Sequence, residues 1–322
     1  MSNQVNKKTA IVTGGAGFIG SHLAEELASH DYRVIILDDL STGKMANIAP
    51  ILTQGDVQFV PGSITALSLL NKLFQSIDYV FHLAAITSVP RSIENPLASH
   101  DVNITGTLNV LTAAKDNKVK KLIYASSSSV YGDTPTLPKK EDMPPKPQSP
   151  YAVTKLASEH YCQVFHQAFG LPTVCLRYFN VYGPKQDPGS QYAAVIPKFI
   201  SRLLQNKPPI IFDDGKQTRD FTFVNDAVEA TILAAENDAR GVFNIGTHQR
   251  TTINELAQLI AKLMGKDIEP IHQEPRPGDV RHSLADISRA RQLGYEPKYT
   301  LEQGLKETIT SFHNTTKTWP PS

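Results

Sequence analysis

Short apolar runs alternate with longer amphipathic segments over the first half of the chain. The short runs have the length of buried strands and cover residues 9–13, 33–37, 57–60, 78–82, 121–125 and 173–178. The segments between them predict helices over residues 21–29, 66–75, 97–117 and 151–169. Such alternation is typical of βαβ units, which build a parallel sheet with helices on both faces. We therefore predict an α/β fold with a doubly wound parallel sheet.

After Gly183 the pattern loosens, because proline and glycine separate shorter elements. Helices are predicted over residues 194–205, 252–264 and 301–312, and short strands over 209–212 and 220–223. Residues 242–245 have the composition of a strand that could return to the sheet as its last member.

A chain of 322 residues is long enough for two structural units with a large core. We expect the first unit, the sheet domain, to comprise residues 1–179 and about 224–247. The second, residues 180–223 and 248–322, is predicted to be a smaller mixed α/β lobe that binds substrate.

A glycine-rich turn, Gly14-Gly-Ala-Gly17-Phe-Ile-Gly20, joins the first strand directly to the first helix. Gly14 permits a tight turn, Gly17 lets the backbone approach a pyrophosphate, and Gly20 allows close packing of helix on strand. The helix N-terminus, where Phe18 and Ile19 lie, favours the phosphate charge. The motif predicts a Rossmann-like dinucleotide site.

The second strand leads into Asp38, eighteen residues after Gly20. A carboxylate at this place can accept hydrogen bonds from both hydroxyls of an adenosine ribose, and it would repel a 2′-phosphate. The position therefore favours NAD as the cofactor. Asp39 is the alternative ribose ligand, and either carboxylate could instead cap the following segment.

Composition narrows the kind of partner. Lys and Arg number 32 against 31 Asp and Glu, so we expect a small-molecule partner, no nucleic acid and no membrane. Cys162 and Cys175 suit a reducing compartment, and no apolar leader or membrane-length run is present, so a cytoplasmic protein is expected. The ten histidines form no ligand-spaced cluster, so no metal is expected, and His82 is interpreted as a packed strand-end residue.

Tyr151-Ala-Val-Thr-Lys155 places a phenol and an ammonium on one face of the helix that Ser149 and Pro150 begin. A fixed ammonium, together with an oxidised nicotinamide, favours phenolate and lowers the tyrosine pKa toward neutrality. Upstream, the run Ser126–Ser129 ends a strand and supplies hydroxyls to the same edge of the sheet. The order of these motifs after a dinucleotide loop predicts a catalytic constellation.

With these motifs the chain resembles the extended short-chain dehydrogenase/reductases, and within them the NAD-dependent nucleotide-sugar 4-epimerases. The resemblance covers nearly the whole chain. It is carried by residues 13–20, His82-Leu-Ala-Ala85, Asn103, Ser127, Val130-Tyr-Gly132, Tyr151, Lys155, 176–183, Arg219-Asp220 and 276–279.

The resemblance implies that Tyr151 is the base, Ser127 its hydrogen-bond partner, and Lys155 the group that tunes the phenol and binds the ribose. A hydride would pass from sugar C4 to tightly held NAD, and the 4-keto sugar would rotate before the hydride returns. Further cofactor contacts are implied at Ser63, Ile64, Leu83, Ala84, Ala85, Asn103 and Tyr178. Ser63 stands where the family has an aspartate that reaches adenine, which predicts weaker cofactor retention.

The same resemblance places the nucleotide diphosphate in the second lobe, held by Asn180, Arg219 and Arg276. Two guanidiniums facing a pyrophosphate is chemically reasonable. Asp279 would bind the uridine ribose, and the neighbourhood of Ile211 and Phe212 would face uracil. Ser88, Val195 and Ser283 complete the implied substrate contacts.

Ser128 and Ser129 stand where the related 4,6-dehydratases carry an Asp-Glu pair, which disfavours dehydration. Residues 88–92, 186–197 and 278–288 resemble the branch that acts on UDP-N-acetylglucosamine. In that comparison Ser283 replaces a bulky aromatic residue and leaves room for an N-acetyl group. The alternatives are a UDP-glucuronate 4-epimerase, a strict UDP-glucose 4-epimerase or, from another class, a non-catalytic NAD-binding regulator.

Relatives of this kind usually pair through two helices from each subunit. The resemblance therefore implies a homodimer with a four-helix bundle, built here from residues 97–117 and 151–169.

Overall fold

The computed structural model describes residues 7–54, 56–189, 194–275 and 280–317. A seven-stranded parallel sheet forms its centre, in the order β11-β6-β5-β4-β1-β2-β3. Its strands are β1 (Thr9–Thr13), β2 (Arg33–Asp38), β3 (Val57–Pro61), β4 (Tyr79–His82), β5 (Lys121–Ser127), β6 (Thr173–Tyr178) and β11 (Gly241–Ile245). The order 3-2-1-4-5-6 is that of the Rossmann fold, and β11 extends it by one strand. The predicted fold class is confirmed.

Both faces of the sheet are buried, which explains why its strands read as continuous apolar runs. Ala10 and Val12 point into one hydrophobic core, whereas Ile11 points into the other. The same alternation separates Leu176 from Cys175 on β6. Side chains on a strand alternate between faces, so a strand without polar positions requires cover on both sides.

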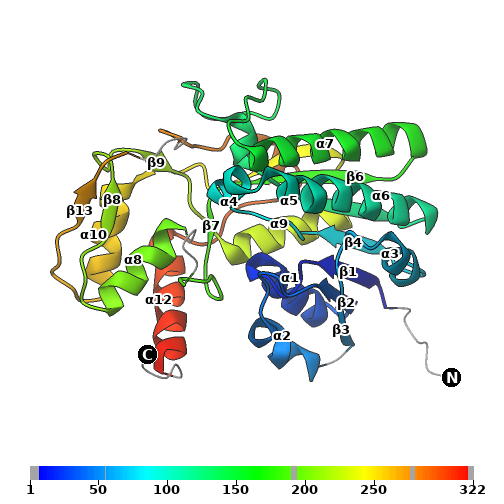
Figure 1. Ribbon diagram of the computed structural model, residues 1–322, viewed down its shortest axis with the longest axis horizontal. Helices are drawn as coiled ribbons and strands as arrows, with labels where there is room; N and C mark the ends of the chain where they lie inside the picture. The colour runs from blue at the N-terminus through cyan, green and yellow to red at the C-terminus, as the bar shows by residue number, and fades with distance from the viewer. Residues whose placement is uncertain (1–6, 55, 190–193, 276–279, 318–322) are drawn as a thin grey trace.

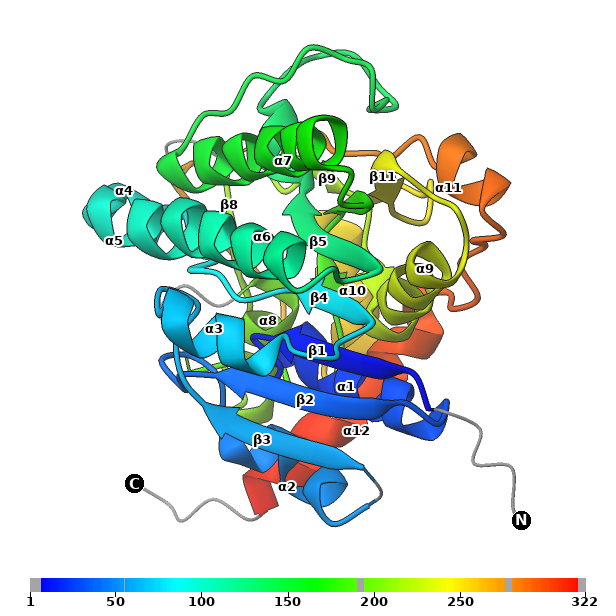
Figure 2. The same cartoon turned by 90° about the vertical axis from the view of Figure 1, so that its right-hand side faces the viewer.

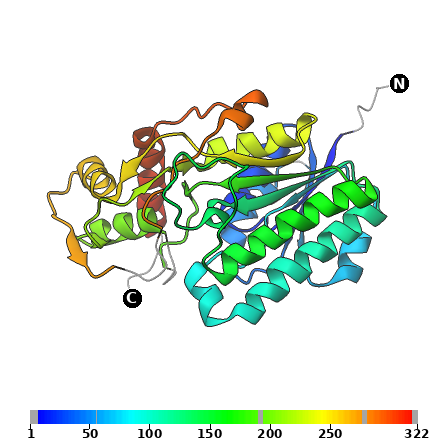
Figure 3. The same ribbon diagram turned by 90° about the horizontal axis from the view of Figure 1, so that it is seen from above.

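Two groups of helices supply that cover (Figures 2 and 3). One face carries α1 (Phe18–Ser29), α2 (Met45–Leu52) and α9 (Val224–Glu236). The opposite face carries α3 (Leu67–Leu73), α6 (Gly106–Asp116) and α7 (Pro150–Phe169). Short helices α4 (Val89–Glu94) and α5 (Pro96–His100) precede α6.

Two features differ from the sequence prediction. The helix predicted over residues 97–117 contains a π-helical turn, Asp101–Thr105, between α5 and α6. Helix α9 was not predicted, because alanine, valine and isoleucine lie on most of its faces and blur the helical period. It is buried because it packs between the sheet and the second lobe.

The smaller lobe lies beside the sheet, at the left of Figure 1. Its helices are α8 (Val195–Leu204), α10 (Ile253–Leu263) and α12 (Leu301–Lys317), whereas α11 (Ser288–Gln292) packs against β11 at the edge of the sheet (Figure 2). Its strand pairs are β7 (Val181–Tyr182) with β10 (Thr222–Phe223), β8 (Ile210–Phe212) with β13 (Ile271–Gln273), and β9 (Thr218–Arg219) with β12 (Thr251–Thr252). The strand predicted over 220–223 is thus shorter, and Asp220 lies between two strands. Within the described ranges, no helix has the length and apolar character needed to cross a membrane.

Candidate active site

The glycine-rich turn lies where the strand order reverses, between β1 and β4, which is the usual ligand crevice of such sheets. Gly14 has a φ of +71°, and a Cβ there would lie 2.7 Å from the Ala84 nitrogen. A Cβ on Gly20 would collide with the Gly14 carbonyl oxygen. Glycine is therefore required at both positions by close backbone approach.

Gly17 is the N-cap of α1, and no side chain in the described parts of the chain caps that helix. Its first amide groups can therefore donate to an anion, and the helix dipole favours negative charge there. A pyrophosphate fits this cradle, with Phe18 and Ile19 at the start of α1.

Asp38 is only 8% exposed and lies beside the same turn. One carboxylate oxygen accepts a hydrogen bond from the Ala16 amide at 2.9 Å, and the other accepts from the Leu40 amide at 2.8 Å. Burial raises the pKa of Asp38, and the two amides counter this rise. Asp39 is exposed, and its carboxylate accepts a hydrogen bond from the Ser41 amide at 2.9 Å. Of the two candidates, Asp38 is the one that contacts the glycine-rich turn, and its contact with a ribose stays a prediction.

The loop after β4 meets this cradle. The Leu83 amide donates to the Thr13 carbonyl at 3.1 Å, and Ala84 lies against Gly14, with Ala85 next in the chain. In the loop after β3, the Ser63 hydroxyl accepts from the Thr65 hydroxyl at 3.0 Å. The Thr65 amide donates to the same oxygen at 3.4 Å, so both lone pairs of the Ser63 hydroxyl have a local donor.

Asn103 is 1% exposed and lies in the π-helical turn. Its side-chain oxygen accepts from the Ile86 amide at 2.8 Å, and its nitrogen donates to the Ile86 carbonyl and the Thr154 hydroxyl at 3.0 Å each. Asn103 thus ties the loop after β4 to α7. In this geometry it supports the cofactor loop, and the predicted direct cofactor contact stays a prediction.

His82 is completely buried at the end of β4. Its Nδ1 lies 2.7 Å from the Thr13 hydroxyl and its Nε2 lies 2.9 Å from the Thr107 hydroxyl. Burial, together with the charge of Lys155, lowers the pKa of His82 to about 3. His82 is therefore a neutral, packed strand-end residue, as the sequence predicts.

The structure brings Ser127, Tyr151 and Lys155 together at the carboxyl end of β5. The Ser149 hydroxyl caps α7 by accepting from the Ala152 amide at 3.2 Å, which starts the helix at the reactive pair. The Lys155 ammonium donates to the Ala125 carbonyl at 2.7 Å and lies 5.8 Å from the Tyr151 ring centroid. Ser127 ends β5, and its side chain lies close enough to the Tyr151 phenol to lower the pKa of that phenol.

The two titratable members of this group are both shifted by burial. Burial raises the pKa of Tyr151 to about 12, against which the nearby Ser127 side chain acts. Burial lowers the pKa of Lys155 to about 8, against which the charge of Glu159 acts. A buried phenol of this kind needs added positive charge to serve as a base near neutrality.

Three predicted substrate residues, Asn180, Arg219 and Ser283, lie around Asp220. The Asn180 side chain donates to the Asp220 carbonyl at 2.9 Å, and Arg219 donates to the Thr218 carbonyl at 3.0 Å. The Ser283 amide donates to the same Thr218 carbonyl at 3.0 Å, and Ser283 is 8% exposed. Arg276 and Asp279 lie outside the described residues.

The Asp220 carboxylate is fully buried and holds this region together. One oxygen accepts from the amide and hydroxyl of Thr247 at 2.8 and 2.6 Å. The other accepts from the His248 and Ala285 amides at 3.0 Å each. These bonds fix the segment of Ser283 next to the strand of Arg219.

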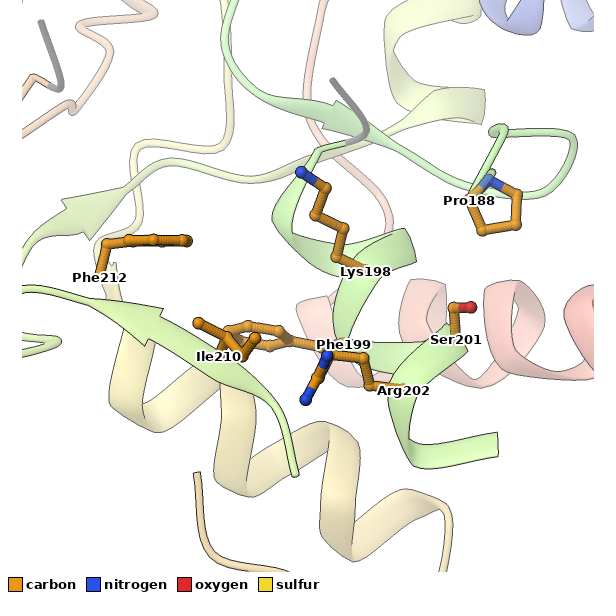
Figure 4. Close-up of a pocket in the computed structure, with 7 residues that line it drawn as sticks. All are labelled: Pro188, Lys198, Phe199, Ser201, Arg202, Ile210 and Phe212. Carbon is orange, nitrogen blue, oxygen red and sulfur yellow. The ribbon is translucent and has the colours of Figure 1, made fainter. Parts of the chain in front are cut away.

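The two residues predicted to face uracil lie next to each other on β8 but in different surroundings. Ile211 is 1% exposed and belongs to the core, whereas Phe212 lines a cavity of about 290 Å³ between β8 and α8. Figure 4 shows Lys198 and Phe212 extending toward the same space, with Arg202 on the next turn of α8. Lys198 and Arg202 were not predicted. Lys198 and Arg202 are four residues apart on α8, which starts at Val195, so they share one face of the helix. This spacing was the sequence signal that could have predicted them.

Two further predicted residues have local partners. The Ser88 hydroxyl caps α4 by accepting from the Arg91 amide at 3.2 Å. The Tyr178 hydroxyl lies 2.7 Å from the Thr231 hydroxyl of α9, and its ring packs in the core. Both residues lie at the ends of elements that border the site.

Fold and site together define a dinucleotide-dependent enzyme of the short-chain dehydrogenase/reductase type. Residues 10–246 match the NAD dependent epimerase/dehydratase family. The chain is 39% identical over 308 residues to the UDP-glucose 4-epimerase of Mycolicibacterium smegmatis, covering 94% of this chain and 98% of that protein. The chain therefore belongs to the NAD dependent epimerase/dehydratase family.

Two solved structures are similar over almost the whole chain. A UDP-N-acetylglucosamine 4-epimerase from Methanobrevibacter ruminantium, in complex with UDP-N-acetylmuramic acid, superimposes with a TM-score of 0.93 at 43% identity, covering 96% of this chain and 99% of that one. A UDP-glucose 4-epimerase from Thermus thermophilus, in complex with NAD, superimposes with a TM-score of 0.87 at 36% identity, covering 95% and 99%. The predicted family and the predicted cofactor, NAD, are confirmed.

Proposed function

We propose that the protein catalyses reversible C4 epimerisation of a UDP-hexose, with UDP-N-acetylglucosamine and UDP-N-acetylgalactosamine as the preferred pair. The observation that carries this proposal is the convergence of Ser127, Tyr151 and Lys155 beside the glycine-rich turn. A non-catalytic regulator would not need all three side chains at one place.

The side chains divide the chemistry between them. Tyr151 takes the proton of the sugar 4-hydroxyl and returns it, and Ser127 holds the same oxygen. Lys155, pinned to the Ala125 carbonyl, stabilises the phenolate form of Tyr151. Bound NAD supplies reversible hydride acceptance, so no net oxidation of the sugar occurs.

The proposal for the preferred sugar depends on Ser283 and on similarity to a solved structure. Its small side chain leaves space beside the segment that Asp220 holds, and the structurally similar protein from Methanobrevibacter ruminantium is a UDP-N-acetylglucosamine 4-epimerase. Activity toward UDP-glucose is compatible with a roomy pocket. A UDP-glucuronate 4-epimerase is the second candidate, since the serine run would be shared.

The direct test incubates the purified protein, without added NAD, separately with UDP-N-acetylglucosamine, UDP-glucose and UDP-glucuronate, and follows the anomeric protons by NMR. We expect conversion of the N-acetyl sugar to its galacto epimer. Turnover that starts only after NAD is supplied would show weak cofactor retention, as predicted from Ser63. No turnover with added NAD would contradict the 4-epimerase proposal for these sugars.

We also propose a homodimer that buries one helical face. Large apolar side chains are exposed on α4, α5 and α7: Ile93 58%, Leu97 76%, Val153 49% and Val164 50%. Exposed apolar side chains concentrated on adjacent helices are typical of an association surface. A second copy of the chain fits them, because two helices from each subunit can pack as a bundle.

Replacing Leu97 with glutamate is expected to shift the dimer toward monomer, measured by size-exclusion chromatography with light scattering. The matched control is Ile271→Glu, which adds the same charge at a site 47% exposed in the second lobe. A wild-type protein that is monomeric at micromolar concentration would contradict the proposed dimer.

A further inference from the structure

A buried ion pair connects α7 to the sheet behind the reactive residues. Glu159 and Arg177 are 1% and 4% exposed. One Glu159 oxygen accepts from Arg177 Nη2 at 2.7 Å, and the other accepts from Arg177 Nε at 2.9 Å. The Ser126 hydroxyl donates a third hydrogen bond to the second oxygen. The carboxylate is therefore bonded on both oxygens in a site from which water is excluded.

This ion pair lies at the level of the catalytic serine. Ser126 immediately precedes Ser127 on β5, and its partner in the sheet register on β6 is Arg177 itself. Glu159 lies one helical turn after Lys155 and two turns after Tyr151, hence on the same face of α7. One carboxylate thus joins the helix of Tyr151 and Lys155 to the strand that ends in Ser127.

Stability alone does not account for such a pair. A buried ion pair is often no more stabilising than apolar side chains of similar volume, because both charges lose their hydration. Apolar side chains could not bond Ser126, and they would place no charge near Lys155. Those two properties are specific to the carboxylate.

We propose that Glu159 is a positioning residue for the reaction, which fixes Ser127 against Tyr151 through Ser126 and holds a compensated negative charge beside the Lys155 ammonium. The inference rests on the proposed roles of Tyr151 and Lys155.

The groups that face Lys155 come from three elements. Tyr151, Glu159 and Cys162 lie on α7, Tyr124 on β5 has its ring centroid 4.9 Å from the ammonium, and His82 lies on β4. Glu159 supplies the one carboxylate in this set.

The charge of Glu159 raises the pKa of Lys155, which burial lowers to about 8. Glu159 itself is faced by Ser126 and by Arg177, whose guanidinium also lies over the Tyr131 ring at 4.7 Å. Removal of the Glu159 charge therefore lowers the Lys155 pKa, and the uncompensated guanidinium of Arg177 acts in the same direction.

The test compares Glu159→Gln, Ser126→Ala and the double variant Glu159→Gln with Arg177→Gln. Glutamine keeps the size of Glu159 and an oxygen for Ser126, but it removes the charge. We expect the alkaline limb of the kcat/KM profile to move down by about 1 pH unit in Glu159→Gln. The limb should return toward the wild-type position in the double variant. Ser126→Ala should leave the limb in place and lower kcat about 10-fold, because Ser127 is less well fixed.

A second measurement is independent of turnover. The phenolate absorbance of each enzyme is titrated and compared with that of its Tyr151→Phe counterpart, which isolates the Tyr151 phenol. Tyr151 is expected to ionise at lower pH in Glu159→Gln than in wild type, because a negative charge on the same face of α7 is removed while Arg177 keeps its positive charge.

Unchanged limbs and unchanged Tyr151 titration in a folded, NAD-retaining Glu159→Gln variant would overturn the inference. If the wild-type protein turns over no UDP-sugar, the titration still decides the role of Glu159, and the failure then belongs to the proposed function. Should Glu159→Gln not fold, the double variant and Ser126→Ala decide: a wild-type kcat in Ser126→Ala would contradict the positioning role.

Discussion

Replacing Tyr151 with phenylalanine is expected to lower kcat for epimerisation by about 10³-fold while NAD remains bound. The change removes one hydroxyl and keeps the buried ring between Ser127 and Lys155. Without that hydroxyl, no side chain in the described site is placed to take the proton of the sugar 4-hydroxyl. The measurement is initial rate by NMR or coupled assay, with bound NAD determined after denaturation.

Tyr124 offers a matched control for this variant. Its phenol is also buried and lies by Lys155, with the ring centroid 4.9 Å from the ammonium, but it faces Ser158 on the inner side of α7. Tyr124→Phe is therefore expected to keep kcat within about 10-fold. Equal rates in Tyr151→Phe and wild type would refute the assignment of the base, and equal losses in the two variants would indicate a general effect on packing.

Replacing Ser283 with tyrosine is expected to lower kcat/KM for UDP-N-acetylglucosamine about 100-fold and to leave UDP-glucose turnover within a few-fold of wild type. Ser283 is 8% exposed, and its backbone is held by the Thr218 carbonyl, so the segment has little freedom to retreat from a larger side chain. A phenol ring there would occupy the space that we propose for the acetamido group. Parallel assays on the two sugars measure the ratio.

Ser283→Ala is the control, since it removes the hydroxyl without adding volume. If the volume of the side chain at this position determines which sugar is accepted, both activities should be retained in this variant. Equal loss of the two activities in Ser283→Tyr would contradict the role of Ser283 in sugar choice. Retention of bound NAD and an unchanged urea midpoint show that the substituted protein is folded.

Local sequence was sufficient to predict the main features on the cofactor side of the molecule. Gly14 and Gly20 are dictated by backbone contacts a few residues away or on the adjoining strand, and Tyr151 and Lys155 share a face because of helical periodicity alone. The parallel sheet followed from strands without polar positions. These features arise from short-range geometry, which the sequence of a short segment determines.

Other features could be decided only by the tertiary structure. That Asp38, and not Asp39, contacts the Ala16 amide of the glycine-rich turn is one of them, and the support that Asn103 gives to a loop 17 residues away in the chain is another. Ile211 and Phe212 are adjacent in sequence, yet one belongs to the core and the other lines a cavity. Strand pairing and the packing of α8 separate them.

The sequence by itself therefore determined the Rossmann fold and NAD as the cofactor, and it predicted Ser127, Tyr151 and Lys155 as one group, which the structure brings together. Only the tertiary structure decided which groups surround the buried carboxylates near the site. These are the pairing of Glu159 with Arg177 and the hydrogen bonds from Thr247, His248 and Ala285 to Asp220. The physical reason is that a buried charge is tolerable only where distant segments bring donors to it. Those donors have no fixed spacing along the chain, so no local sequence pattern predicts them.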